Sequence, residues 1–109
     1  MDTATADTDR LLRVAIGERR LVTFMLNGFP RIAEPHDYGI MRGVAKLFFY
    51  QVGGQSSKPP PVGWRLGELA GISQLNILDD RFSGPRPVRS GRHIQWDRLL
   101  ATVSPRATS

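Results

Sequence analysis

The segment from Glu34 to Tyr38 holds the densest group of chemically active side chains in this sequence. It reads Glu-Pro-His-Asp-Tyr. On an extended strand Glu34, His36 and Tyr38 would share one face, and Asp37 would lie on the other face with Pro35. A carboxylate beside an imidazole can orient it for proton transfer. The pattern favours a hydrogen-bonded surface or binding row over such catalysis.

Three arginines lie in or next to the apolar segments of the chain, at Arg31, Arg65 and Arg86. A guanidinium matches the geometry of a phosphate or carboxylate, and its burial is costly unless it is paired. Two interpretations follow. The arginines line a groove and bind an anionic ligand, or Arg31 pairs with Glu34 and Arg65 with Glu68 or Glu34. Such pairs would only stabilise the fold.

Aromatic and amide side chains accompany these arginines. Tyr50 and Trp64 could stack a nucleic-acid base, although aromatic residues of a small barrel more often belong to its core. Trp64 and Leu66 should point away from the face of Arg65, which would turn Arg65 outward, beside Tyr50 on a neighbouring strand. The candidate ligand-binding set is therefore Arg31, His36, Tyr50, Gln51, Arg65 and Arg86.

The sequence contains no recognisable catalytic or metal-binding motif. There are no cysteines, and the two histidines, His36 and His93, lie far apart with no further ligand at metal-binding spacing. Nucleophile-elbow and phosphate-loop motifs are also absent from the sequence. We therefore expect a protein that is not an enzyme and that has no metal or cofactor.

Apolar periodicity predicts one helix followed by five strands. Thr8-Asp9 offers an N-cap for a helix of about ten residues, with Leu12 and Ile16 on its apolar face. Asn27-Gly28 predicts a type I′ hairpin turn. Pro30 and Pro35 would place the second strand at a sheet edge or interrupt it. The predicted strands are 21–26, 29–38, 44–52, 64–69 and 72–78, with a turn at 39–43 and a last element of undetermined type at 96–103.

These elements predict a mainly β protein that folds as a small, partly open barrel with an N-terminal amphipathic helix. A chain of 109 residues has room for one domain, which we place at residues 9–103, between disordered tails at 1–8 and 104–109. Lys58–Pro61 would form the stiff end of a loop. The expected core is Leu12, Ile16, Phe24, Leu47, Phe48 or Phe49, Leu66, Ile72, Leu75, Leu78 and Phe82.

The charge balance of the chain is strongly basic. The net charge is +5, and arginine outnumbers lysine thirteen to two. Six of the arginines lie from Arg81 onward, where Asp97 is the single acid. This excess points to a nucleotide or nucleic-acid ligand, or else reflects the codon usage of a GC-rich genome. No apolar stretch is long enough to span a membrane and no secretory signal is visible, so we expect a cytoplasmic protein without a membrane partner.

The order of these segments resembles the WYL domain, a small Sm-like (SH3-like) β-barrel of bacterial regulators. The resemblance runs through Lys46–Val52, Trp64–Leu66 and Ile72–Phe82, with Phe49-Tyr50-Gln51 where the family name reads Trp-Tyr-Leu. The family's frequent Asp-Arg-Ile is Ala70-Gly71-Ile72 here. A subgroup of small, often stand-alone WYL-like proteins is similar in four further strings, which are Asn27–Gly39, Tyr50–Gly54, Gly63–Arg65 and Gly84–Pro87.

The resemblance implies a ligand-sensing or regulatory module of a transcription regulator. Ten residues precede the predicted helix, so we expect no helix-turn-helix and no direct promoter recognition. Our leading hypothesis is a barrel that binds a nucleotide, a short single-stranded nucleic acid or another anionic ligand through its arginines. The alternative is a protein–protein assembly module that forms a homo-oligomer or joins a partner regulator through its sheet edges. A hydrolase using Glu34 and His36 is a third hypothesis.

Overall fold

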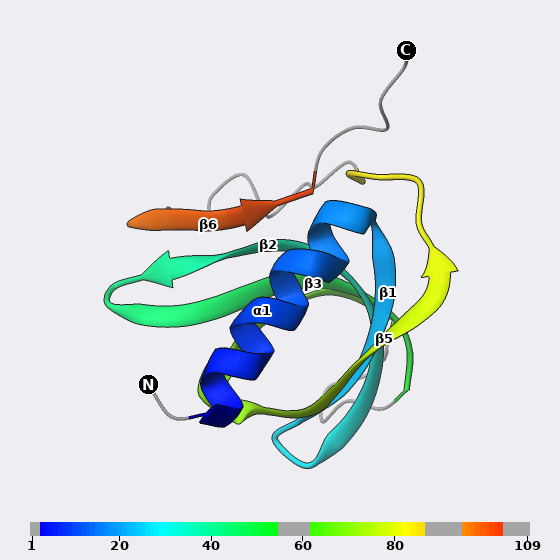
Figure 1. Ribbon diagram of the computed structural model, residues 1–109, viewed down its shortest axis with the longest axis horizontal. Coiled ribbons are helices and arrows are strands. Elements are labelled where there is room, and N and C mark those ends of the chain that lie inside the picture. The colour runs from blue at the N-terminus through cyan, green and yellow to red at the C-terminus, as the bar shows by residue number, and fades with distance from the viewer. Residues whose placement is uncertain (1–2, 55–61, 87–94, 104–109) are drawn as a thin grey trace.

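The computed structural model describes residues 3–54, 62–86 and 95–103 (Figure 1). One helix is followed by a series of strands. The elements are α1 (Thr3–Glu18), β1 (Arg20–Leu26), β2 (Phe29–Met41), β3 (Val44–Gly54), β4 (Gly63–Glu68), a 3₁₀ turn η1 (Leu69–Gly71), β5 (Ile72–Arg81) and β6 (Arg98–Thr102).

The strands form one curved antiparallel sheet in the order β4-β3-β2-β1-β5, and β6 pairs with β2 outside this path. The sheet bends around on itself, and α1 crosses it on one side (Figure 1). The predicted fold class is therefore confirmed: a small barrel-like β domain with an N-terminal helix. The undetermined element at 96–103 contains the sixth strand, β6, which the sequence did not predict.

Strand β2 is central, so of the two predicted alternatives the edge position was wrong, and it is the pairing with β3 that is interrupted. Strand β2 pairs with β1 on one side and β3 on the other. Pro30 lies before the first residue of β2 that pairs with β3, which is Arg31. Pro35 is accommodated because the register with β3 shifts between Pro35 and Asp37, which leaves His36 without a partner residue on β3. This bulge turns Tyr38 to the core, opposite Leu47. The expectation that Tyr38 shares a face with Glu34 and His36 was therefore also wrong.

Two hairpin turns have the same backbone form. Asn27-Gly28 has φ angles of 52° and 85°, which confirms the predicted type I′ turn between β1 and β2. Arg42-Gly43 repeats the pattern between β2 and β3, with φ angles of 50° and 77°. Asparagine tolerates the left-handed conformation well, whereas arginine is uncommon there.

Helix α1 begins at Thr3, earlier than the sequence predicted, so Thr8 and Asp9 lie inside the helix and do not cap it. Residues 3–8 are accordingly helical and not part of a disordered tail. The apolar face is as expected, with Leu12, Ala15 and Ile16 fully buried. The helix is also tied to β2, because the Tyr38 hydroxyl donates a hydrogen bond of 2.6 Å to Asp9.

The core lies between α1 and the concave side of the sheet. Phe24 and Phe49 meet edge to face there, with ring centroids 5.2 Å apart. Most of the expected core is buried, but Leu66 is 41% exposed and Leu78 is half-buried. No helix in the described part of the chain is long and apolar enough to cross a membrane. The predictions for Lys58–Pro61 and for the tail at 104–109 concern residues that lie outside the ranges described by the structure.

Candidate functional site

Strand pairing divides the side chains of β2, β3 and β4 between two faces. The inner face contains Phe49 and Leu47 and is turned to the core. The outer face carries Tyr50, Trp64 and Glu34, which lie opposite one another across the three strands. The two faces place the predicted site residues in separate groups.

The six predicted ligand-binding residues form an inner and an outer group. Arg65 pairs with Phe49, and Tyr50 pairs with Trp64, so Arg65 and Tyr50 point to opposite sides of the sheet. Our expectation that Arg65 is turned outward beside Tyr50 was wrong. Its neighbours Trp64 and Leu66 do point away from it, as predicted, but the face they occupy is the outer one.

The outer cluster consists of Glu34, His36 and Arg86. Arg86 donates two hydrogen bonds to the Glu34 carboxylate, from Nε to Oε1 at 2.6 Å and from Nη2 to Oε2 at 2.8 Å. His36 Nε2 lies 3.2 Å from the same Oε1. Glu34 and His36 are both buried, whereas the Arg86 side chain is 42% exposed. A buried carboxylate is thus neutralised from the surface by a bidentate arginine.

The protonation states of Glu34 and His36 in the outer cluster follow from these contacts. Burial alone would raise the pKa of Glu34, but the hydrogen bonds and charges of Arg86 and His36 hold it below its ordinary value. Burial lowers the pKa of His36, despite the opposing effect of Glu34. Near neutral pH, Glu34 is therefore an ionised acceptor already engaged by Arg86, and His36 is neutral.

Aromatic rings on the outer face contact one another and the outer cluster. Trp64 stacks on Phe48, with an interplanar angle of 6° and centroids 4.5 Å apart. The Arg86 guanidinium lies 4.0 Å from the centroid of the Tyr50 ring. Trp64 also meets His36 edge-on. These contacts occupy faces of the rings that a stacked base would use.

The inner cluster consists of Arg31, Gln51 and Arg65. Arg31 is 6% exposed and lies opposite Phe24 of β1. Its Nη1 donates to Gln51 Oε1 at 3.0 Å, and its Nη2 donates to the Leu26 carbonyl at 3.4 Å. Its Nε is buried and has no hydrogen-bond partner among the described residues. Both acceptors are uncharged, and the predicted alternative of an Arg31–Glu34 ion pair does not form, because Glu34 binds Arg86.

Burial lowers the pKa of Arg31, and the positive charge of nearby Arg65 lowers it further. The guanidinium remains charged near neutral pH, since arginine does not lose its proton in proteins. Two like charges are therefore held close together on the inner face, with one of them almost fully buried. An anion placed between them would remove this repulsion.

Sequence reasoning identified Arg86 as a candidate but not its partner, which lies 52 residues away on β2. The string Gly84–Pro87 gave no indication of that contact. No group of three or more potential metal ligands occurs among the residues that the structure describes. His93, the second histidine, is not among them.

Comparison of this chain with protein-family models, curated proteins and solved structures finds no match. Its assignment therefore depends on its own residues.

Proposed function

We propose that this protein is a binding module for a small anionic ligand, which it holds at the inner cluster through Arg31 and Arg65. The observation that carries this proposal is the environment of Arg31. Its guanidinium is almost fully buried, hydrogen-bonded only to uncharged groups among the described residues, and next to a second arginine. A buried charge of this kind is costly unless an opposite charge accompanies it.

A phosphate or carboxylate fits this environment better than a neutral ligand. The unused Nε–H of Arg31 is a donor, and a guanidinium binds such groups through two parallel hydrogen bonds. Arg65 as a whole is only half-buried, although its Nε is buried like that of Arg31. Gln51 fixes the orientation of Arg31 by accepting from Nη1 and donating to the Gly53 carbonyl at 2.9 Å.

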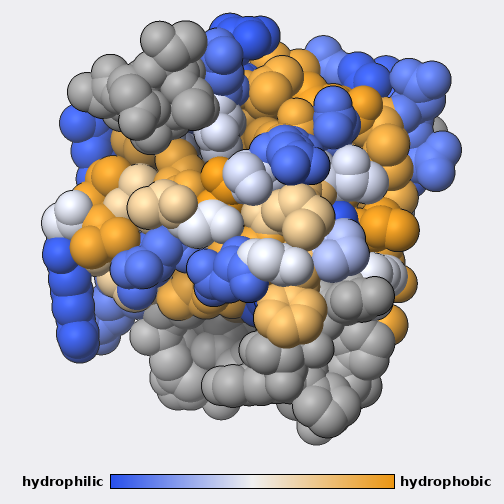
Figure 2. Space-filling view, turned by 90° about the horizontal axis from the view of Figure 1, so that it is seen from below, coloured by the Kyte–Doolittle hydropathy of each residue, from blue (hydrophilic) through white to orange (hydrophobic). Residues whose placement is uncertain are grey.

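The face seen in Figure 2 and the contacts of two aromatic rings favour a small ligand, such as a nucleotide, over a nucleic-acid polymer. In Figure 2, hydrophilic residues in the described part of the face form small groups separated by apolar ones. Polymer binding usually uses a continuous basic surface with accessible aromatic rings. Tyr50 and Trp64 are already engaged by Arg86 and Phe48. Short single-stranded oligonucleotides are therefore tested as a second class of ligand, after the mononucleotides.

The resemblance to WYL domains supports a sensory or regulatory role for such a ligand. A cytoplasmic location would suit that role, because nucleotides are abundant there. In this view, ligand binding stabilises one conformational state of the barrel, and a partner regulator or a second copy of this chain binds that state selectively.

The proposal is tested by ligand-induced stabilisation. The melting temperature of the protein is measured with phosphate, mononucleotides, cyclic dinucleotides and short single-stranded oligonucleotides. A ligand at about 100 times its Kd should stabilise the fold by about 2.7 kcal/mol. Oligonucleotide binding should in addition weaken steeply with salt. If no anion in this series raises the melting temperature, the proposal fails.

Variants locate the site. Arg65→Ala should weaken binding by about tenfold, the loss of one charge-assisted hydrogen bond, and Arg31→Met should weaken it at least as much. Arg10→Gln is the matched control, because it removes the same charge from an exposed position on α1. Equal losses in all three variants would show general charge attraction and contradict a site at the inner cluster.

The exposed edges of the sheet favour one alternative, the assembly module. Strands β4 and β5 end the described sheet on its two sides. Leu66 on β4 and Val62 just before it are 41% and 46% exposed. Sedimentation of the wild-type protein and of Leu66→Lys distinguishes this function. An oligomer that Leu66→Lys dissociates, together with no response to anions, would favour assembly.

A further inference from the structure

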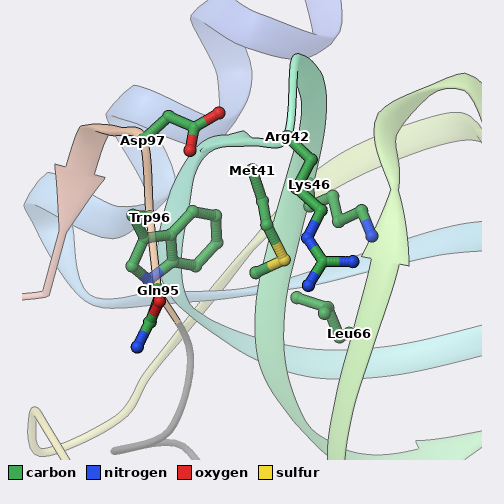
Figure 3. Close-up of a pocket in the computed structure, with 7 residues that line it drawn as sticks. All are labelled: Met41, Arg42, Lys46, Leu66, Gln95, Trp96 and Asp97. Carbon is green, nitrogen blue, oxygen red and sulfur yellow. The ribbon is translucent and has the colours of Figure 1, made fainter.

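A hollow lies at the end of β2 remote from Arg31. It has a volume of about 490 Å³ and opens beside the hairpin turn between β2 and β3 (Figure 3). Its lining residues come from three strands and from the segment before β6. They are Met41, Arg42, Lys46, Leu66, Gln95, Trp96 and Asp97. The inner cluster contributes none of them.

One wall of the hollow is the indole of Trp96, and contacts of the neighbouring Asp97 hold the main chain of this segment against β2. The Asp97 main-chain amide donates to the Ile40 carbonyl at 2.8 Å, and the Gly43 amide donates to Asp97 Oδ2 at 3.1 Å. Trp96 also lies close over Gly39, where a Cβ atom would come within 2.8 Å of its Cε3. These contacts place the indole over Gly39 and beside Met41 (Figure 3).

The opposite side of the hollow carries two cations. Arg42 is exposed and Lys46 is half-buried, and both are drawn with Leu66 across from Trp96 (Figure 3). Neither is joined to a carboxylate by an ion pair within the described ranges. The turn does not explain Arg42, because its φ of 50° suits asparagine or glycine better. Asn27 holds the equivalent position in the other hairpin turn.

We propose that this hollow binds a small carboxylate that has an aromatic or aliphatic body. The body would lie against Trp96, Met41 and Leu66, and the carboxylate would pair with Arg42 and Lys46. Two cations and Asp97 give the lining a net charge of +1, which one carboxylate neutralises. The volume is within the range of small-molecule sites. This site is independent of the anion site proposed at the inner cluster.

The test uses phenylacetate as the probe. Phenylacetamide is its uncharged analogue, and acetate is the analogue that lacks the aromatic ring. The readout is the NMR signal of the Trp96 indole N–H, assigned by comparison with a Trp64→Phe variant. Phenylacetate should shift this signal and saturate it, and both analogues should bind at least about tenfold more weakly. No saturation by about 10 mM phenylacetate, or equal binding of phenylacetamide, would overturn the proposal.

A pair of variants distinguishes the effect of the Arg42 charge on binding from the effect of the backbone conformation at this position. Arg42→Asn removes the guanidinium and places a favoured residue in the left-handed conformation, so phenylacetate affinity should fall about tenfold while the melting temperature stays equal or rises. Arg19→Asn is the matched control, because Arg19 also has a left-handed φ, of 53°, and lies outside the hollow. Equal losses in the two variants would contradict the site.

Arg31→Met distinguishes this site from the one at the inner cluster. It should leave phenylacetate binding at the hollow unchanged, whether or not the inner cluster binds an anion. Loss of phenylacetate binding in Arg31→Met would show that the probe occupies the inner cluster, and would overturn the assignment to the hollow.

Discussion

The outer and inner clusters bury charge in opposite ways. In the outer cluster a buried carboxylate, Glu34, is met by the bidentate guanidinium of Arg86 and by His36. In the inner cluster the buried guanidinium of Arg31 is met by an amide, a carbonyl and a second cation. The outer cluster is complete as an ion pair, whereas the inner cluster is the place where we propose that an anion binds. This difference separates a stabilising contact from a candidate binding site.

The largest expected effect comes from breaking the outer pair. Arg86→Met leaves Glu34 buried without its main partner, which in fully buried pairs costs 3–5 kcal/mol. Because Arg86 is 42% exposed, water screens part of the loss, and we expect about 2 kcal/mol. Urea unfolding measures it, with the exposed Arg81→Met as control. An unchanged free energy of unfolding for Arg86→Met would mean that the outer pair does not stabilise the fold.

The outer cluster also predicts a loss of stability in acid. Both pKa values are lower in the folded state than their ordinary values, 6.5 for His36 and 4.5 for Glu34. The unfolded chain therefore binds more protons, and stability falls as the pH drops below about 6.5 and again below about 4.5, by up to about 1.4 kcal/mol per pH unit for each group. His36→Gln should remove the first decline when unfolding is measured from pH 7 to 4. A decline that persists in this variant would assign it to another group.

The contact of Tyr50 with Arg86 should contribute less. Tyr50→Leu removes the ring beneath the guanidinium and should cost about 0.5–1 kcal/mol, because Arg86 is partly solvated. Tyr50→Phe keeps the ring and should be nearly neutral. The two variants are compared by urea unfolding in the wild-type and Arg86→Met backgrounds. An equal cost of Tyr50→Leu in both backgrounds would show that the ring acts through other contacts.

The smallest effect is expected at the inner cluster. The double variant Arg31→Met with Gln51→Met replaces a hydrogen-bonded pair by apolar side chains, which should leave stability without ligand unchanged or raise it by about 1 kcal/mol. Urea unfolding in a buffer free of phosphate measures this. A loss comparable to that of Arg86→Met would show that Arg31 is a structural partner, and the contrast between the clusters would disappear.

The sequence predicted the fold class and the Asn27-Gly28 hairpin, because apolar alternation and turn chemistry are local signals. It did not predict the face of Arg65. Phe48 and Phe49 are both apolar, so alternation could not tell which of them points to the core. Phe49 does, and Arg65 opposite it points inward as well.

The remaining errors have one physical cause, which is that they depend on contacts between distant segments. The bulge at His36 exists because Pro35 sits in a central strand, and it reverses the face of Tyr38. The pairing of Arg86 with Glu34 brings an irregular segment onto β2. The Trp96 wall forms only because β6 pairs with β2 beside Gly39. Neither the composition of the chain nor the spacing of its residues indicates which distant segments come into contact.

The most direct measurement of the central claim is the NMR signal of the Arg31 Nε–H during titration with the nucleotide that gives the largest thermal shift. This donor has no partner among the described residues, so a bound phosphate should move its signal downfield and saturate it in step with the thermal stabilisation. Arg10→Gln should leave that response intact. A saturating nucleotide that shifts other signals but leaves the Arg31 Nε–H in place would contradict an anion site at the inner cluster.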